Sequence, residues 1–350
     1  LVNKEQRIQE LEREMEAADF WNDPEVSQKK MKELKSMKDD VATYASLTTQ
    51  FEDIETLIEM GYEENDATLI PEIEEMLTEF TTTYDAIRAK TLLSGEYDGD
   101  NAIVSLHAGA GGTESCDWAA MLYRMYTRWA DDKGYSVEVL DSLDGEEAGI
   151  KSVTFQVNGE NAYGYLKSEN GVHRLVRVSP YNAQGKRMTS FASVFVTPLV
   201  DDSIEVYVDP SRVSWDLFRS GGAGGQNVNK VETGVRLRYQ YKDPDTGEEE
   251  EILIENTESR KQLENRENAM RLLKSQLYDR ALQKRKAKQA EIEAGKKKIE
   301  WGSQIRSYVF DDRRVKDHRT NFQTSDVNGV MDGKLDGFIK SYLMEFAGGE

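Results

Sequence analysis

A glycine-rich segment at residues 220–230 offers the groups best suited to chemistry in this sequence. Four of the five positions 221–225 are glycine, and Gln226 follows directly. Because glycine has no side chain and tolerates positive φ, such a segment can bring backbone N–H groups against a ligand. The Gln226 amide donates and accepts hydrogen bonds but cannot act as a base at neutral pH. The segment therefore suits orienting water or stabilising an oxyanion; the alternative is a flexible linker.

A second glycine-rich segment, residues 109–112, lies between an expected strand and an expected helix. This context resembles a phosphate-binding loop. However, no Lys-Ser/Thr pair follows at the spacing of a P-loop, and a dinucleotide-binding fold would need a parallel βαβ unit with an acidic residue about 20 positions later. Asp131 and Asp132 meet only the last condition. We interpret the segment as a tight turn that lets a strand and a helix pack closely.

The other residues provide no catalytic set for an independent esterase. The chain has three histidines and one cysteine, Cys116, and no Gly-x-Ser-x-Gly motif. A lone cysteine forms neither an internal disulfide nor a cysteine-based zinc site, which fits a cytoplasmic protein. We expect no metal, no cofactor and no hydrolysis by the isolated chain.

Length and charge distribution indicate separate modules. The chain has 350 residues and a net charge of −20, and it contains no run of about 18 apolar residues that could span a membrane. Residues 1–100 hold 10 Lys/Arg and 26 Asp/Glu, a net charge of 10 − 26 = −16. Residues 261–300 hold 12 Lys/Arg and 6 Asp/Glu, a net charge of 12 − 6 = +6. The basic segment is suited to RNA phosphates, and the alternative is a solvated helix face.

Hydrophobic periodicity and turn residues predict an α+β multidomain protein. Residues 4–60 and 71–93 follow a helical period, interrupted at Asp23-Pro24, which predicts a helix cap. The later elements alternate between strands and helices. Strands are expected at 102–107, 136–140, 152–157, 190–196, 203–208, 234–241, 251–255 and 307–310, and helices at 118–129, 259–294 and 337–346. Changes in composition divide the chain into four expected domains: 1–96, 97–210, 211–298 and 299–350.

At this point the sequence resembles a known family. Gly224-Gly225-Gln226 is similar to the Gly-Gly-Gln loop of bacterial class I peptide-chain release factors, and Phe20-Trp21-Asn22-Asp23-Pro24 resembles their release factor 2 branch. Three further segments follow the family in order: residues 108–118, 171–177 and 301–308. The matches cover nearly the whole chain.

The resemblance implies a role in translation termination on the 70S ribosome. A decoding domain (97–210) would recognise the messenger RNA stop codon. The Gly-Gly-Gln domain (211–298) would promote hydrolysis of the P-site peptidyl-tRNA ester, and the C-terminal segment would pack back on the decoding domain. The family further implies a glutamine methyltransferase that modifies Gln226 and a class II release factor GTPase as partners.

The resemblance assigns the stop-codon tripeptide to Ser179-Pro180-Tyr181. Release factor 2 has Ser-Pro-Phe there and release factor 1 has Pro-x-Thr, so the serine implies recognition of UAA and UGA. A stiff loop with a flat aromatic face suits single-stranded RNA, whose bases are recognised by stacking and by their edges. Arg177, Lys186 and Arg187 flank the tripeptide and could meet phosphates.

Further residues follow from the same resemblance. Thr189 matches a residue implied to recognise the third base. Met188 stands where the family has a histidine, so it can cover a base but cannot stack a ring on it. Gly145-Glu146 is matched to the helix start implied to accept the first uridine. Trp301 is implied to lie at a hinge that rearranges on codon recognition; the alternative is a core tryptophan at a domain junction.

Two rival functions share part of this pattern. A ribosome-rescue hydrolase has Gly-Gly-Gln but recognises no codon, and it carries a basic tail, whereas this chain ends in residues 345–350 without a basic run. A non-catalytic ribosome-binding protein would use the helical front as a docking arm and leave the ester intact.

Overall fold

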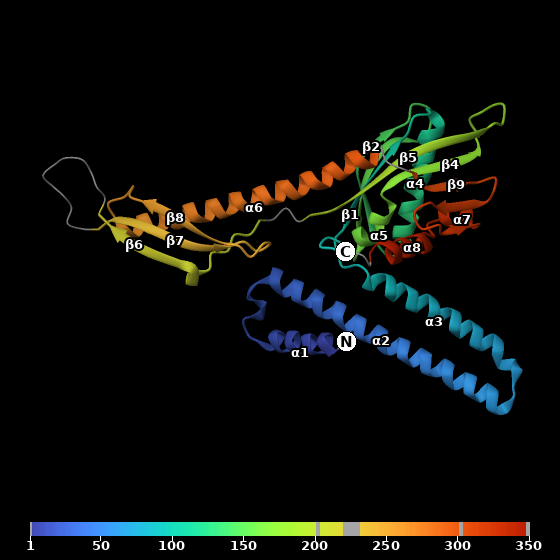
Figure 1. Cartoon of the computed structure of the whole chain (residues 1–350), viewed down its shortest axis with the longest axis horizontal. Helices are drawn as coiled ribbons and strands as arrows, with labels where there is room; N and C mark the ends of the chain where they lie inside the picture. Colours follow the sequence, from blue (N-terminus) through green and yellow to red (C-terminus); the bar gives the residue numbers. More distant parts are fainter. Residues whose placement is uncertain (1, 201–203, 220–231, 301–303, 348–350) are drawn as a thin grey trace.

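The computed structural model describes residues 2–200, 204–219, 232–300 and 304–347, and shows three bodies built from different elements (Figure 1). A helical N-terminal part lies beside a large mixed α/β body, and one long helix connects that body to a small three-stranded sheet. The structure confirms the expected α+β multidomain class. No helix within the described ranges combines the length and apolar character needed to cross a bilayer.

The N-terminal part is formed by α1 (Val2–Glu16), α2 (Pro24–Glu64) and α3 (Ile70–Thr91). The expected cap at the start of α2 is present. The Asp23 carboxylate accepts hydrogen bonds from the N–H groups of Glu25, at 3.1 Å, and Val26, at 3.3 Å, while Pro24 occupies the first turn. Asn65 ends the helix in the left-handed conformation. The chain then reverses, so α3 runs back along α2 (Figure 1).

The large body is an eight-stranded sheet in the order β11-β10-β9-β4-β5-β1-β3-β2. All neighbouring strands are antiparallel except β4 and β9, which are parallel. Its strands are β1 (Ala102–Ala108), β2 (Ser136–Asp144), β3 (Ile150–Asn158), β4 (Gly171–Val178), β5 (Arg187–Pro198), β9 (Gln304–Val309), β10 (Arg314–Asp317) and β11 (Gln323–Thr324).

One amphipathic helix supplies much of the core against this sheet. Helix α4 (Thr113–Asp132) buries Trp118, Leu122, Met125 and Trp129, which recur at helical spacing. These side chains belong to one hydrophobic cluster with alternate residues of β1, β3 and β5. The shorter helices α5 (Ala162–Leu166), α7 (Val327–Met331) and α8 (Asp336–Phe346) complete the cluster.

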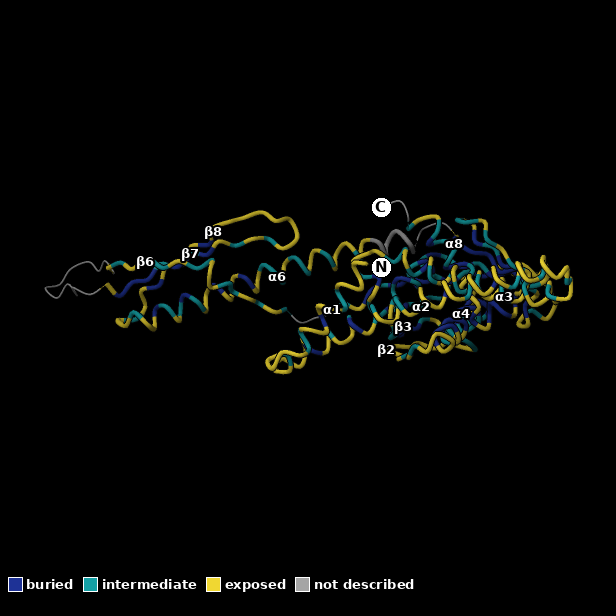
Figure 2. Tube along the Cα trace, turned by 90° about the horizontal axis from the view of Figure 1, so that it is seen from below, coloured by how far each residue is buried: buried dark blue, intermediate teal, exposed yellow. Residues whose placement is uncertain are grey.

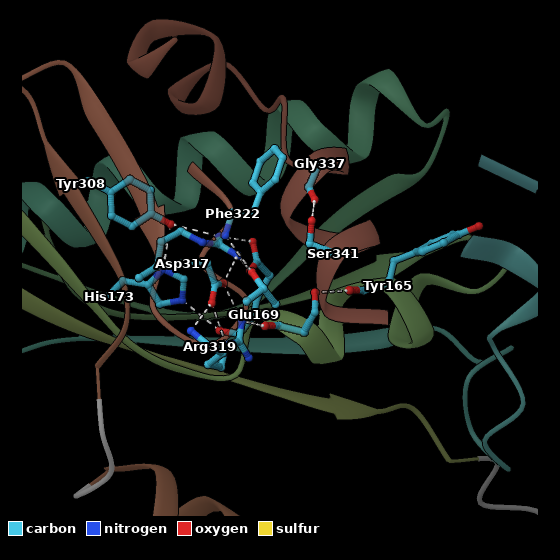
Figure 3. Close-up of polar contacts among 12 residues, drawn as sticks. Tyr165, Glu169, His173, Tyr308, Asp317, Arg319, Phe322, Gly337 and Ser341 are labelled. Atoms are coloured by element: carbon cyan, nitrogen blue, oxygen red, sulfur yellow. Dashed lines mark hydrogen bonds and ion pairs between the residues drawn. The ribbon is translucent and has the colours of Figure 1, made fainter. Parts of the chain in front are cut away.

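A buried ion cluster attaches the C-terminal strands to the large sheet. The Arg306 guanidinium on β9 donates to Glu169 at 2.8 Å and to Asp317 at 3.2 Å, and all three side chains are fully buried. Figure 3 shows Glu169, His173, Tyr308 and Asp317 converging in this region. The two ring nitrogens of His173 lie 2.8 Å from the Tyr308 hydroxyl and 2.9 Å from the Glu169 carbonyl oxygen. A buried charge is stable only when it is paired and hydrogen-bonded in this way.

The small sheet is β6 (Val213–Phe218), β7 (Gly234–Lys242) and β8 (Glu249–Asn256), all antiparallel. Helix α6 (Gln262–Glu300) packs Ala269, Leu273 and Leu277 against it. Its 39 residues correspond to a length of about 58 Å at 1.5 Å per residue. Figure 2 shows that buried residues line the small sheet and the large body, whereas α6 between them is mostly exposed or partly exposed.

The element boundaries differ from the sequence expectation in a few places. A strand was expected at 203–208, but no strand forms over the described residues 204–208. The alternating side chains Val206 and Val208 instead pack on the small hydrophobic core without strand pairing. Strands β4, β6, β10 and β11 were not expected. Strand β4 carries His173, Arg174 and Arg177 among its apolar residues, and β10 and β11 have only four and two residues.

The buried His173 makes a testable contribution to pH-dependent stability. Burial, followed by the positive charge of Arg306, lowers its pKa to about 4. An unfolded histidine binds a proton at about pH 6.5, so stability is complete above that pH and falls as the pH drops towards 4. The full loss in the free energy of unfolding between these two pH values is about 3 kcal/mol. His173→Gln should remove this part of the slope in thermal unfolding measured from pH 7 to pH 4.5. Equal slopes in both proteins would contradict the assignment.

Candidate functional site

The Gly-Gly-Gln motif connects two paired strands of the small sheet. Gly224, Gly225 and Gln226 lie outside the described residues, but the strand ends on either side are described. Phe218 of β6 pairs with Gly234 of β7. A Cβ atom on Gly234 would lie 2.9 Å from the Phe218 ring, so glycine permits this close approach.

The tripeptide Ser179-Pro180-Tyr181 directly follows β4 and begins the β4–β5 hairpin connection. In the strand register Met188 lies opposite Arg177, and Thr189 opposite Val176. The hairpin therefore brings the tripeptide, Met188 and Thr189 to one end of the large sheet. Figure 1 places this end in the large body and the small sheet at the other end of α6, so the hairpin and the strands that flank the Gly-Gly-Gln motif belong to different bodies.

Ser179 is hydrogen-bonded to the first turn of α4. Its hydroxyl donates to Glu114 Oε2 at 2.6 Å and accepts the N–H of Tyr181 at 3.1 Å. Only 4% of Ser179 is exposed. By contrast, Pro180, Tyr181, Met188 and Thr189 are exposed at the surface of the hairpin. The buried serine thus orders the backbone that presents its exposed neighbours.

Arg177 completes this polar cluster. Its Nε donates to Glu114 Oε1 at 2.8 Å and its Nη2 to Asp117 at 2.5 Å. Burial by itself would raise the pKa of Glu114, but the hydrogen bonds from Arg177 and Ser179 outweigh it, so the pKa lies below its usual value. Glu114 is therefore a carboxylate that accepts from both neighbours. The sequence expectation that Arg177 meets phosphates is not supported, because its guanidinium is committed inside the protein.

The other flanking arginine is also paired. Arg187, at the start of β5, lies 2.9 Å from Asp311 and 3.5 Å from Asp312 in the turn between β9 and β10. This pair is half-exposed and contributes little to stability. It does link the hairpin to the C-terminal strands. Lys186 is exposed and remains a candidate for a phosphate contact.

The assignment of Gly145-Glu146 to a helix start is wrong. Both residues lie in the connection between β2 and β3. This connection packs against the true helix start nearby, where Thr113 of α4 donates to Glu147 at 3.0 Å. A Cβ atom on Gly149 would lie 2.3 Å from the Cys116 backbone.

The glycine-rich segment at residues 109–112 forms the tight turn that was expected. Gly111 and Gly112 have φ values of 140° and 64°, and Gly109 N–H donates to the Phe191 carbonyl at 2.7 Å. A Cβ atom on Gly109 would lie 2.6 Å from that oxygen. The turn brings the start of α4 against β5, next to Ser179.

Glu114 and Asp117 were missed as functional candidates. They stand three residues apart, so they lie on one face of α4. An acidic pair in the first turns of a helix, directly after a glycine turn, was the signal that could have indicated them. Trp301, expected at a hinge, lies outside the described residues.

Removing the charge of Glu114 tests this cluster. Glu114→Gln keeps the size but leaves Arg177 with Asp117 alone, so we expect a loss of about 1–3 kcal/mol of stability at neutral pH. Because the folded pKa of Glu114 is lowered, the difference should shrink as the pH falls below the usual glutamate value near 4.5. Thermal unfolding followed by tryptophan fluorescence measures both effects.

Glu147→Gln is the matched control for this experiment. It removes an exposed carboxylate next to the same helix start, and its stability should change little. A difference between wild type and Glu114→Gln that does not depend on pH would show that the carboxylate charge is unimportant.

Comparisons with known proteins agree over the whole chain. A family model described as the PCRF domain matches residues 4–194, and one described as the RF-1 domain matches residues 202–319. Two curated relatives are named peptide chain release factor 2, from Clostridium perfringens and Exiguobacterium sp. They are 46% and 47% identical over 344 residues, which cover 98% of this chain and 92% of each relative.

A solved structure is similar as well. RF2 of Thermus thermophilus is 42% identical and covers 99% of this chain and 95% of its own, with a TM-score of 0.51. Chains of this similarity share the fold of each domain.

Proposed function

The chain belongs to the peptide chain release factor 2 family and acts in stop-codon-dependent translation termination, and we propose that it recognises UAA and UGA and promotes hydrolysis of peptidyl-tRNA. The ribosome is its partner. The observation that carries the proposal is the β4–β5 hairpin, in which Glu114 anchors Ser179 beneath exposed Pro180 and Tyr181.

Codon recognition is assigned to the exposed side of this hairpin. Tyr181 and Met188, with 48% and 38% of their surface exposed, offer a ring and a flexible thioether to bases splayed out of a single strand. Thr189 offers a hydroxyl to the third base. Ser179, at the first place of the tripeptide, favours UAA and UGA. Gly145 and Glu146 form no helix terminus, so neither is assigned a role in recognising the first base.

Ester hydrolysis is assigned to Gly224, Gly225 and Gln226. The backbone N–H of Gln226 would donate to the oxyanion or to the leaving 3′-hydroxyl, an interaction typically worth about 2.7–4 kcal/mol. The side chain would admit and orient water, and the two glycines would provide the backbone shape. Because the Gln226 amide cannot act as a base, we expect hydrolysis only on the ribosome.

The division of labour follows the proposed domains 1–96, 97–210, 211–298 and 299–350. Helix α6 separates the two active loops, and Trp301 is proposed as the hinge residue after it. Several α6 cations already have protein partners: Arg280 with Glu250, Lys284 with Asp243, and Lys288 with Glu96. Contacts of α6 with RNA phosphates would use its other basic residues or replace these weak surface pairs.

Two further partners are proposed on the strength of the family. A glutamine methyltransferase would modify Gln226, and a class II release factor GTPase would act together with this chain. A codon-independent rescue hydrolase is not favoured, since the PCRF match covers residues 4–194, which include the codon-recognition hairpin.

Peptide release from defined ribosome complexes tests the function. Complexes programmed with UAA, UGA, UAG or a sense codon should release peptide with UAA and UGA only. The half-saturating concentration and the maximal rate would be measured for each codon. Efficient release with UAG would contradict the type 2 assignment, and release with none of the stop codons would contradict the proposed function.

Two substitutions separate the backbone and side-chain roles of Gln226. Gln226→Ala retains the N–H and should be milder, whereas Gln226→Pro removes it and should lower the maximal release rate by about 100- to 1000-fold, as losing an oxyanion donor does. Stop-codon-dependent binding to the ribosome should be unchanged in both. Equal severity of the two substitutions would count against a role of the backbone N–H.

A further inference from the structure

A buried asparagine on α6 fastens the chain where it leaves the Gly-Gly-Gln loop. Asn265 is fully buried and lies in the first turns of α6. We propose that Asn265 is a positioning residue for release, because it fixes the exit of that loop to α6. The inference rests on the proposed function of the loop.

Every polar atom of the Asn265 amide is used. Its Oδ1 accepts the Ser259 N–H at 2.8 Å, and its Nδ2 donates to the Ser259 carbonyl at 2.8 Å and to the Thr233 carbonyl at 2.7 Å. A buried amide with all its hydrogen bonds made holds one rotamer and one set of partners. The side chain thus joins the segment before α6 to the segment before β7.

Thr233 is the residue that makes this contact relevant to the loop. It directly precedes Gly234, the first residue of β7, and lies seven positions after Gln226. On the other side of the loop, Phe218 pairs with Gly234. The two ends of the intervening segment therefore meet at one point, and the Thr233 carbonyl is held there by Asn265. Gln262 adds a second, exposed contact to the Glu232 carbonyl at 3.3 Å.

Helix α6 is a firm support for this contact. Ala269, Leu273 and Leu277 anchor the helix in the small core, and the Arg266 guanidinium lies 5.3 Å from the centre of the Trp215 ring on β6. The Thr233 carbonyl is thereby tied to the same helix that runs to the large body. Catalytic groups displaced by about 1 Å can lose about 100-fold in rate, so such a tie matters for an oxyanion donor seven residues away.

The same contacts could serve only to stabilise the small domain. That simpler role predicts that the loss of release activity follows the loss of stability, wherever in the domain the stability is lost. A positioning role predicts a loss specific to Asn265. Leu277 provides the comparison, because it belongs to the same core on the same helix, twelve residues or about 18 Å further along.

The test compares Asn265→Ala with Leu277→Ala in full-length protein. Release kinetics on UAA complexes and thermal unfolding would be measured for both. We expect Asn265→Ala to lower the maximal rate by about 10- to 100-fold with an unchanged half-saturating concentration. Leu277→Ala, with an equal or larger loss of stability, should keep the maximal rate within about twofold. Equal rate losses at equal stability loss would overturn the proposal, as would an unchanged rate in Asn265→Ala.

Asn265→Asp provides a second, nearly isosteric variant. It keeps an acceptor for the Ser259 N–H but has no donor for the Thr233 carbonyl, so it should lower the rate as much as Asn265→Ala. A rate like that of wild type would show that the Thr233 contact is unimportant and would overturn the proposal.

Hydrogen exchange gives a readout that does not depend on release. The peptide covering residues 227–235 should exchange faster in both Asn265 variants and not in Leu277→Ala. Unchanged exchange in the Asn265 variants would overturn the positioning role. A failure of the wild-type protein to release peptide would contradict the proposed function but not this result, because the exchange measurement does not depend on release.

Discussion

The buried Arg306 cluster is the interaction on which the architecture depends. Between β5 and β9 the chain leaves the large body, forms the small sheet and returns along α6. On its return β9 pairs in parallel with β4, the edge strand of the arrangement β4-β5-β1-β3-β2 formed by earlier parts of the chain. Arg306 on β9 reaches Glu169 only when β9 is in place, whereas Asp317 comes from the adjacent strand β10. A buried charge that lacked its partner would cost several kcal/mol. The ion cluster therefore strongly favours a single site for β9.

The position of β9 also determines the position of the codon-recognition hairpin. Strand β4 lies between β9 and β5, so its position is determined by the C-terminal strands on one side and the hairpin partner on the other. The tripeptide begins where β4 ends, and Glu114 on α4 holds its first residue. The Arg187–Asp311 pair joins the other arm of the hairpin to the turn after β9. Segments far apart in sequence thus support one short loop.

The net negative charge of the chain is compatible with an RNA partner, because many of its charged side chains pair with one another within the protein. Many cations of the described residues pair with carboxylates of the same molecule, among them Arg177, Arg280, Lys284 and Lys288. Net charge governs long-range attraction, whereas recognition depends on the few groups presented at each loop. Helix α6 places the two loops in separate bodies, so each can meet a different environment.

Local signals were enough to identify the motifs, because caps, turns and loops depend on residues near in sequence. Asp23-Pro24 predicted a helix start, and Gly109–Gly112 a tight turn, and both are present. Contacts between distant segments were not predictable from one sequence. The link from Glu114 to Ser179 spans 65 residues, and that from Asn265 to Thr233 spans 32. The sequence by itself determined which loops could act; only the tertiary structure decided which side chains hold them, because burial and pairing depend on how the chain folds back on itself.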